Sequence, residues 1–165
     1  MKITDKLVLF FSKKDVCSNF YPCYLSYDGH EFNCSEQLFM YLKALFFNDS
    51  IMATNILKSK TPQEAKRYGR MVRNFDAQLW DNYKDDVMLE AIKTKYSCCV
   101  SFRKFIDEYK DKTFVEASPY DKIWGIGLSE TDPDATDPSK WKGENRLGKC
   151  INKFIEIKYN KNNVK

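Results

Sequence analysis

The sequence contains almost no histidine and no paired-cysteine motif. One histidine occurs in 165 residues, and the six cysteines, at positions 17, 23, 34, 98, 99 and 150, form neither a C-x-x-C pair nor a regular framework. Structural zinc sites need Cys and His ligands at short, fixed spacings, so we expect no metal site. The irregular spacing also argues against a disulfide framework and favours free thiols in a reducing, cytoplasmic compartment.

Long apolar runs are also missing. There is no N-terminal apolar signal region and no run approaching the length of a membrane span, so we expect no membrane partner. Gly and Pro are sparse and 43% of the residues are hydrophobic, which excludes collagen-like and disordered chains. The length fits one domain, which we place at residues 1–160, followed by a frayed basic tail at residues 161–165.

Charge and aromatic content narrow the class of ligand. The net charge of +4 suits a phosphate-bearing substrate but is too small to indicate a nucleic-acid coat protein. Aromatic residues make up 15% of the chain, which supplies a core and permits a cleft that stacks planar rings.

The stretch from Ser35 to Phe47 is predicted to form the best helix of the chain. A broad apolar arc follows a helical period and is made of Leu38, Phe39, Leu42, Leu45 and Phe46. Ser35 is the expected N-cap. Glu36 and Lys43 are seven residues apart, so they share one stripe of the helix beside Met40. Either these charges form a site, or Glu36 only favours the helix N-terminus while Lys43 reaches solvent.

Two further elements are predicted on either side of this helix. A hairpin is expected from Tyr24 to Phe32, with Asp28-Gly29 as its turn. A helix should begin at Thr61-Pro62, where Thr is the cap and Glu64 completes a capping box.

A basic face is predicted on the helix that begins at Thr61. Lys66, Arg70 and Arg73 recur at spacings of four and three, and such a face is usually solvated unless it borders a cleft that receives phosphate. Gly69 lies within this helix, which suggests close approach by another backbone or a ligand.

The second half of the chain should contain two helices from Asp76 to Tyr109, broken near residues 97–99, and a short strand at Thr113–Glu116. Asp121 then precedes a turn that reads Trp124-Gly125-x-Gly127, and glycines of this kind let a backbone approach a ligand closely. A polar surface loop at residues 129–142 and a closing helix at residues 149–159 complete the pattern.

Taken in order, these motifs resemble the NADAR family, also described as YbiA-like or riboflavin-intermediate N-glycosidases. The resemblance covers residues 10–158 and rests on Ser18-Asn19-Phe20-Tyr21-Pro22, Asp28-Gly29, Ser35-Glu36 with Lys43, Lys66-Arg67-Tyr68-Gly69-Arg70, Trp80, Val115-Glu116, Asp121 with Trp124-Gly125-x-Gly127, and Asn145-Arg146-Leu147-Gly148. It implies a small, mainly helical α+β fold in a single domain, with a small N-terminal hairpin or sheet.

The resemblance also implies hydrolysis of the N-glycosidic bond between ribose and an amine-bearing base. Family activities include cleavage of phosphoribosylated pyrimidine intermediates of riboflavin synthesis and removal of ADP-ribose from guanine in nucleic acid. The expected partners are therefore a phosphorylated ribosyl-base or an ADP-ribosylated nucleotide, with nucleic acid as a possible carrier, and no cofactor.

Cleavage of such a bond passes through an oxocarbenium-like ribose and needs a carboxylate and a proton donor. Glu36 and Asp121 are the predicted pair, with their roles unassigned. Lys43 either binds phosphate or ribose hydroxyls as a point charge, or attacks the anomeric carbon and forms a Schiff base. For substrate binding we expect Asn19, Phe20, Arg70, Trp80, Trp124, Gly125, Gly127 and Asn145.

Two other classes of function remain as alternatives. One is a module that binds ADP-ribose or a nucleotide without cleaving it, and the other is a structural helical protein. Charges placed in an apolar setting favour the enzyme, because binding alone does not require them.

Overall fold

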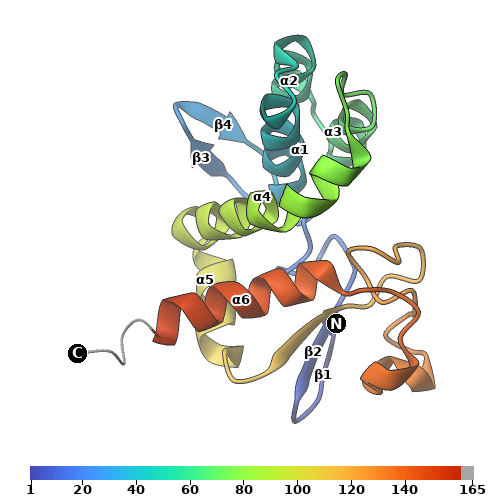
Figure 1. Cartoon of the computed structure of the whole chain (residues 1–165). Coiled ribbons are helices and arrows are strands. Elements are labelled where there is room, and N and C mark those ends of the chain that lie inside the picture. Colours follow the sequence, from blue (N-terminus) through green and yellow to red (C-terminus); the bar gives the residue numbers. More distant parts are fainter. Residues whose placement is uncertain (161–165) are drawn as a thin grey trace. The chain divides into compact units, whose positions relative to one another are not determined.

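The computed structural model describes residues 1–160, in which helices predominate (Figure 1). The chain packs as two units. The sheet unit comprises Met1–Ser18 and the segment from Ser101 onward, and the helical unit comprises Asn19–Val100. The mainly helical α+β class is confirmed. The single domain stays a prediction, and the tail at 161–165 lies outside the described residues.

The sheet unit is built on a three-stranded sheet in the order β1-β2-β5. β2 (Leu7–Phe10) lies antiparallel to β1 (Lys2–Ile3) and parallel to β5 (Thr113–Glu116), with Val8 opposite Phe114. All four residues of β2 are buried, as expected of a strand covered on both faces. The predicted strand at residues 113–116 is therefore confirmed, whereas the sequence pattern did not reveal β1.

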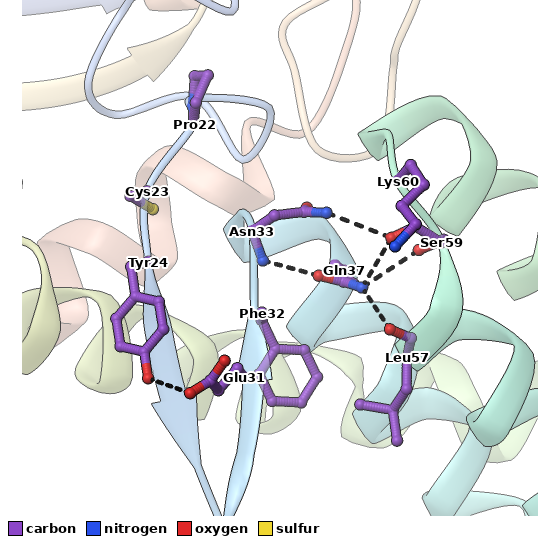
Figure 2. Close-up of a pocket in the computed structure, with 10 residues that line it drawn as sticks. All are labelled: Pro22, Cys23, Tyr24, Glu31, Phe32, Asn33, Gln37, Leu57, Ser59 and Lys60. Atoms are coloured by element: carbon purple, nitrogen blue, oxygen red, sulfur yellow. Dashed lines mark hydrogen bonds between the residues drawn. The ribbon is translucent and has the colours of Figure 1, made fainter.

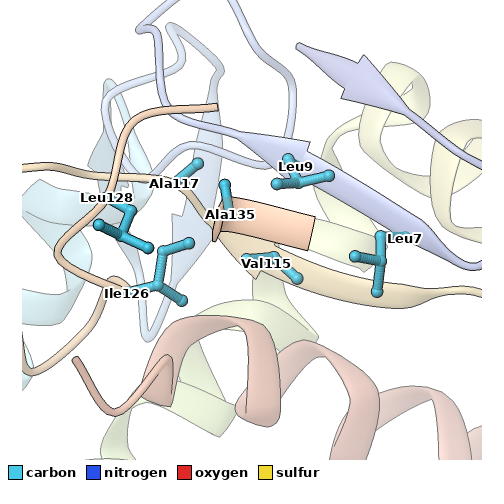
Figure 3. Packing of buried hydrophobic residues seen from close by; sticks show 7 residues of the cluster. All are labelled: Leu7, Leu9, Val115, Ala117, Ile126, Leu128 and Ala135. Atoms are coloured by element: carbon cyan, nitrogen blue, oxygen red, sulfur yellow. The ribbon is translucent and has the colours of Figure 1, made fainter. Parts of the chain in front are cut away.

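An apolar cluster covers this sheet (Figure 3) and consists of Leu7, Leu9, Val115, Ala117, Ile126, Leu128 and Ala135. The predicted polar loop at 129–142 contributes to it, because two 3-10 turns, η1 (Pro133–Thr136) and η2 (Pro138–Lys140), bury Ala135 and pack Trp141 against the cluster. This segment is therefore an ordered part of the core rather than only a surface loop.

Two helices complete the sheet unit. α5 (Val100–Tyr109) leads into β5, and α6 (Arg146–Asn160) packs against that strand. The closing helix begins at Arg146 rather than at the predicted residue 149.

The helical unit begins with the predicted hairpin. β3 (Leu25–Tyr27) pairs with β4 (His30–Phe32), and Asp28 and Gly29 both have positive φ, at 48° and 77°, as a type I′ turn requires. α1 (Ser35–Phe46) then packs against α2 (Ser50–Lys58), α3 (Pro62–Gly69) and α4 (Ala77–Cys98) (Figure 1). The break between α4 and α5 at Cys99 is where the sequence predicts it.

Two expectations for α1 are wrong. The N-cap is Cys34, in an extended conformation with no side-chain capping bond, while Ser35 is the first helical residue and is buried. The apolar arc does not face inward as a whole, because Leu45 is 42% exposed. Burial instead extends around the first two turns, from Ser35 to Tyr41, since the other helices enclose that end.

α3 begins as predicted but ends early. The Thr61 hydroxyl accepts the N–H of Glu64 at 3.1 Å, and the Glu64 carboxylate accepts the N–H of Lys60 at 2.8 Å. The helix stops at Gly69, with Arg70 as its C-cap, so Arg73 does not share a helical face with the other two basic residues. That part of the prediction is wrong.

Candidate active site

Glu36 lies in the buried first turn of α1, where only 7% of it is exposed. Its backbone N–H donates to the carbonyl oxygen of Asn19 at 3.0 Å, which ties the start of the helix to the preceding loop. The Asn19 side chain donates to the sulfur of Met88 at 3.6 Å. Glu36 is thus held in an apolar setting beside a predicted binding residue.

Lys43 lies two turns further along α1 and is half-buried. Its ammonium donates to the carbonyl oxygen of Gly69 at 2.9 Å and lies 4.8 Å from the ring centre of Phe75 and 5.6 Å from that of Trp80. These contacts fix the position of the charge by a hydrogen bond and by two aromatic faces.

The pKa of Lys43 connects the charged residues of this site. Burial lowers the pKa of Lys43 below its ordinary value, the attraction of Glu36 opposes this, and the repulsion of Arg70 adds to it. Glu36, Lys43 and Arg70 therefore interact electrostatically, although Glu36 lies in the first turn of α1 and Lys43 in its last.

Gly69 is required where α1 and α3 approach each other. A Cβ at this position would lie 1.9 Å from the sulfur of Met40 and 2.9 Å from its Cγ. The predicted close approach is therefore made by a side chain of the protein itself, and the same approach brings the Gly69 carbonyl to Lys43.

Trp80 is buried in an aromatic cluster. Its ring lies 5.7 Å from Phe39, 5.7 Å from Phe46 and 5.9 Å from Phe47, and 9% of the residue is exposed. Trp80 borders Lys43 as part of the core, and its role in stacking a base stays a prediction.

The basic residues of α3 lie beside Phe20. The ammonium of Lys66 is 5.8 Å from the centre of the Phe20 ring, while Arg70 is exposed at the end of the helix. In the helical unit the structure thus groups six of the predicted residues, which are Asn19, Phe20, Glu36, Lys43, Arg70 and Trp80.

The remaining predicted residues belong to the sheet unit. The Asp121 carboxylate accepts the N–H groups of Ile123 at 2.9 Å and Trp124 at 2.8 Å, which closes the turn that carries Trp124. A Cβ on Gly125 would lie 2.8 Å from the Asp121 carbonyl oxygen, so this turn admits only glycine there. Gly127 has a φ of 68°, in the region that favours glycine.

Asn145 is buried and uses both ends of its amide on β5. Its Oδ1 accepts the N–H of Glu116 at 3.0 Å, and its Nδ2 donates to the carbonyl oxygen of Phe114 at 3.0 Å. Its φ of 53° lies in the left-handed region that asparagine tolerates. The amide therefore anchors the start of α6 to the strand, and its contact with substrate stays a prediction, as does the pairing of Glu36 with Asp121.

A pocket of about 540 Å³ lies on another part of the helical unit (Figure 2). It contains none of the predicted site residues. Gln37, which follows Glu36 in α1, accepts the N–H of Asn33 at 2.7 Å and donates to carbonyl oxygens that include that of Ile56 at 2.9 Å. This side of α1 binds the end of α2, and its polar groups serve the fold.

Within residues 1–160, no cluster of three or more Cys, His, Asp or Glu residues is arranged to hold a metal ion. Across the same residues, no helix combines the length and the apolar character needed to cross a membrane.

Phe75 is a site residue that sequence reasoning missed. It belongs to no helix or strand, so no periodic pattern marks it, and its contact with Lys43 arises from the loop between α3 and α4.

Comparison with known proteins places these features in a family. The family model for the NADAR domain matches residues 9–156. Protein irg-1 of Caenorhabditis elegans is 37% identical over 169 residues, which cover 93% of this chain and 80% of that protein. N-glycosidase R617 of Acanthamoeba polyphaga mimivirus is 40% identical over 126 residues, which cover 76% of this chain and 74% of that protein. The NMR structure of the E. coli protein YbiA shares the fold, with a TM-score of 0.76 and 24% identity over 99% of this chain and 91% of that one.

Proposed function

This chain belongs to the NADAR family, and from that premise we propose that it is an N-glycosidase that hydrolyses the bond between ribose and an amine-bearing base. Relatives from mimivirus, Nostoc punctiforme and Shigella carry the name N-glycosidase. The observation that carries the proposal is the placement of the buried Glu36 and the half-buried Lys43 on one helix, α1, where their charges interact.

Buried charges are costly unless they are paired or have a chemical role. The charge of Glu36 interacts with that of the hydrogen-bonded Lys43 ammonium, and Glu36 can stabilise the positive charge that develops on the ribose or activate the attacking water. Asp121 is the proposed second carboxylate, which acts on the departing base. The hydrolysis uses one water: the C1–N bond breaks, the base gains a proton, and hydroxide adds to C1.

Phosphate on the substrate is supported by the local charge of the helical unit. The segment from residue 58 to residue 73 has one acidic residue, Glu64, and carries Lys58, Lys60, Lys66, Arg67, Arg70 and Arg73. It therefore holds more net positive charge than the whole chain, whose net charge is +4. We propose Arg70 as the first phosphate contact, with ADP-ribosylated guanine, free or carried on nucleic acid, or a phosphoribosylamino-pyrimidine riboflavin intermediate as substrate.

The two roles of Lys43 can be separated by trapping. If its neutral amine attacks C1, the bond to the base breaks and a Schiff base with the opened ribose forms, which borohydride reduces to a stable adduct on Lys43. If Lys43 acts only as a charge, borohydride traps no adduct. Lys43→Arg, which keeps the positive charge, should then retain part of the activity, whereas Lys43→Met should lose it. The lowered pKa of Lys43 makes the neutral amine more accessible than in an ordinary lysine.

The proposed activity is tested with Glu36→Gln, which keeps the shape of the side chain and removes its charge. Wild type and variant are incubated with an ADP-ribosylated guanine oligonucleotide and with the phosphoribosylamino-pyrimidine, and released ribose species are followed by mass spectrometry. Glu31→Gln is the matched control, because Glu31 is exposed on β4 in the same unit. We expect release by wild type and by the control, and a loss of at least about 100-fold in Glu36→Gln.

The alternative is a module that binds ADP-ribose or a nucleotide without cleaving it. Tight binding of ADP-ribose with no release from either substrate would establish this alternative and refute the glycosidase. The interacting charges of Glu36 and Lys43 favour the enzyme, since a binding module could use exposed cations alone.

A further inference from the structure

The loop between α3 and α4 is fixed at several points. The buried carboxylate of Asp49 accepts the N–H of Arg73 at 2.8 Å and its guanidinium at 3.4 Å. Asn74 has a φ of 60°, and its side chain donates to the carbonyl oxygen of Phe47 at 3.4 Å. Val72 is buried within the same loop. The conformation of the loop between α3 and α4 is therefore set by several contacts of its backbone and side chains with the rest of the helical unit.

Phe75 is presented by this fixed loop. Its ring centre lies 4.8 Å from the Lys43 ammonium and 5.3 Å from the Phe47 ring, yet 49% of the residue is exposed. A large apolar ring that is half-open to water and anchored beside a desolvated cation is a surface that a ligand can cover.

Of the two aromatic rings that contact the Lys43 ammonium, Phe75 offers such a surface and Trp80 does not. Trp80, Phe39 and Phe47 are all buried, at 9%, 3% and 5% exposure. A planar group that approaches Lys43 from solvent therefore meets Phe75 and not the Trp80 ring to which the sequence assigns stacking.

We propose that Phe75 is the residue that stacks on the planar base of the substrate, so that it selects ligands that carry a base over ligands that carry ribose phosphate alone. This rests on the proposed function, whose substrates bring a ribose and a base to Lys43. Stacking of a base on an aromatic side chain depends on the flat ring and tolerates any base, so the selection is for the class of ligand rather than for one base.

The test compares two probes that differ only in the base, which are 5′-GMP and ribose 5-phosphate. Affinities are measured by calorimetric titration for wild type, Phe75→Ala, Phe75→Leu and Phe75→Trp. Phe75→Leu keeps an apolar side chain and Phe75→Trp keeps a flat ring. Ile51→Ala is the matched control, because Ile51 is an exposed apolar residue of the same unit.

We expect wild type to bind 5′-GMP more tightly than ribose 5-phosphate. Phe75→Ala and Phe75→Leu should weaken 5′-GMP by about 5- to 150-fold and leave ribose 5-phosphate within about twofold, while Phe75→Trp restores the difference. With a cleaved substrate, KM should rise in Phe75→Ala more than kcat falls.

Equal loss for both probes would overturn the proposal, because it would indicate a role in folding or in placing Lys43. An unchanged affinity for 5′-GMP in Phe75→Ala, or wild-type protein that prefers neither probe or binds neither, would also overturn it. These titrations need no turnover, so this failure is distinct from a failure of the glycosidase, which the Glu36→Gln assay detects.

Discussion

Replacement of Gly69 by alanine tests how closely α3 must approach α1. The new Cβ would lie 1.9 Å from the Met40 sulfur and 2.9 Å from its Cγ, so Met40, itself buried, must change rotamer or the helices must separate. Overpacking of this kind costs about 1–3 kcal/mol. The higher helix propensity of alanine opposes this cost, because alanine stabilises a helix by up to about 1 kcal/mol relative to glycine. We expect a net loss of about 1 kcal/mol in the free energy of unfolding, or about 2–4 °C in Tm.

The same change should lower activity, because separation of the helices moves the Gly69 carbonyl away from the Lys43 ammonium that it binds at 2.9 Å. Met40→Ala alone leaves a cavity and costs about 2–5 kcal/mol. In Gly69→Ala/Met40→Ala the new methyl group fills part of the vacated space. Urea unfolding of the four proteins should therefore show the double variant about 1–2 kcal/mol more stable than the sum of the single changes. Additivity within about 0.5 kcal/mol would refute the contact as the cause.

The remaining predictions concern three polar groups. Burial lowers the pKa of Lys43, whereas a hydrogen bond to Asp134 raises the pKa of the exposed Lys140. When acetylation is mapped by mass spectrometry, Lys43 should therefore reach half of its maximal rate at a lower pH than Lys140 does. The reverse order of the two lysines would contradict this reasoning. Asp49→Ala should cost about 1–3 kcal/mol in urea unfolding at neutral pH through loss of a helix cap and loop anchor. The hydrogen bond from the N–H of Arg73 holds the pKa of Asp49 in the folded protein below its ordinary value of 3.8. The stability that the Asp49 carboxylate contributes is therefore complete above pH 3.8 and is lost as the pH falls through the folded-state pKa. A difference in unfolding free energy between wild type and Asp49→Ala that widens in acid is incompatible with this. Asn145→Ala should lower Tm more than Asn145→Gly, by the equivalent of about 1 kcal/mol. Both variants lose the hydrogen bonds to β5, but only alanine has a strained backbone at a φ of 53°. Equal Tm values for the two variants would rule out that strain.

Local chemistry explains which elements the sequence predicts correctly. The Asp28-Gly29 turn and the Thr61-Pro62 helix start are both encoded within a few residues, so the hairpin and the start of α3 are found where expected. The parallel pairing of Val8 with Phe114 depends on residues far apart in the chain, and no local pattern contains it.

The errors on α1 have the same cause. Ser35 is a good N-cap by composition, but the chain enters from β4 with Cys34 extended, so the helix starts one residue earlier than a cap at Ser35 requires. Leu45 fits the apolar period, yet it is exposed because none of the neighbouring helices covers it. A periodic pattern identifies an apolar face, whereas the packing of other elements decides which part of that face is buried.

The candidate site shows how the core and the chemistry depend on each other. The sequence reveals Glu36 and Lys43 because their spacing places them on one stripe of a single helix, but Arg70, whose charge also acts on the pKa of Lys43, comes from the end of α3. The aromatic faces of Phe75 and Trp80 reach it from the loop after α3 and from α4. Trp80 is too buried to be a freely exposed stacking surface, and its ring lies against Lys43, whose burial lowers its pKa. The packing that stabilises the helical unit is therefore also what lowers the pKa of Lys43.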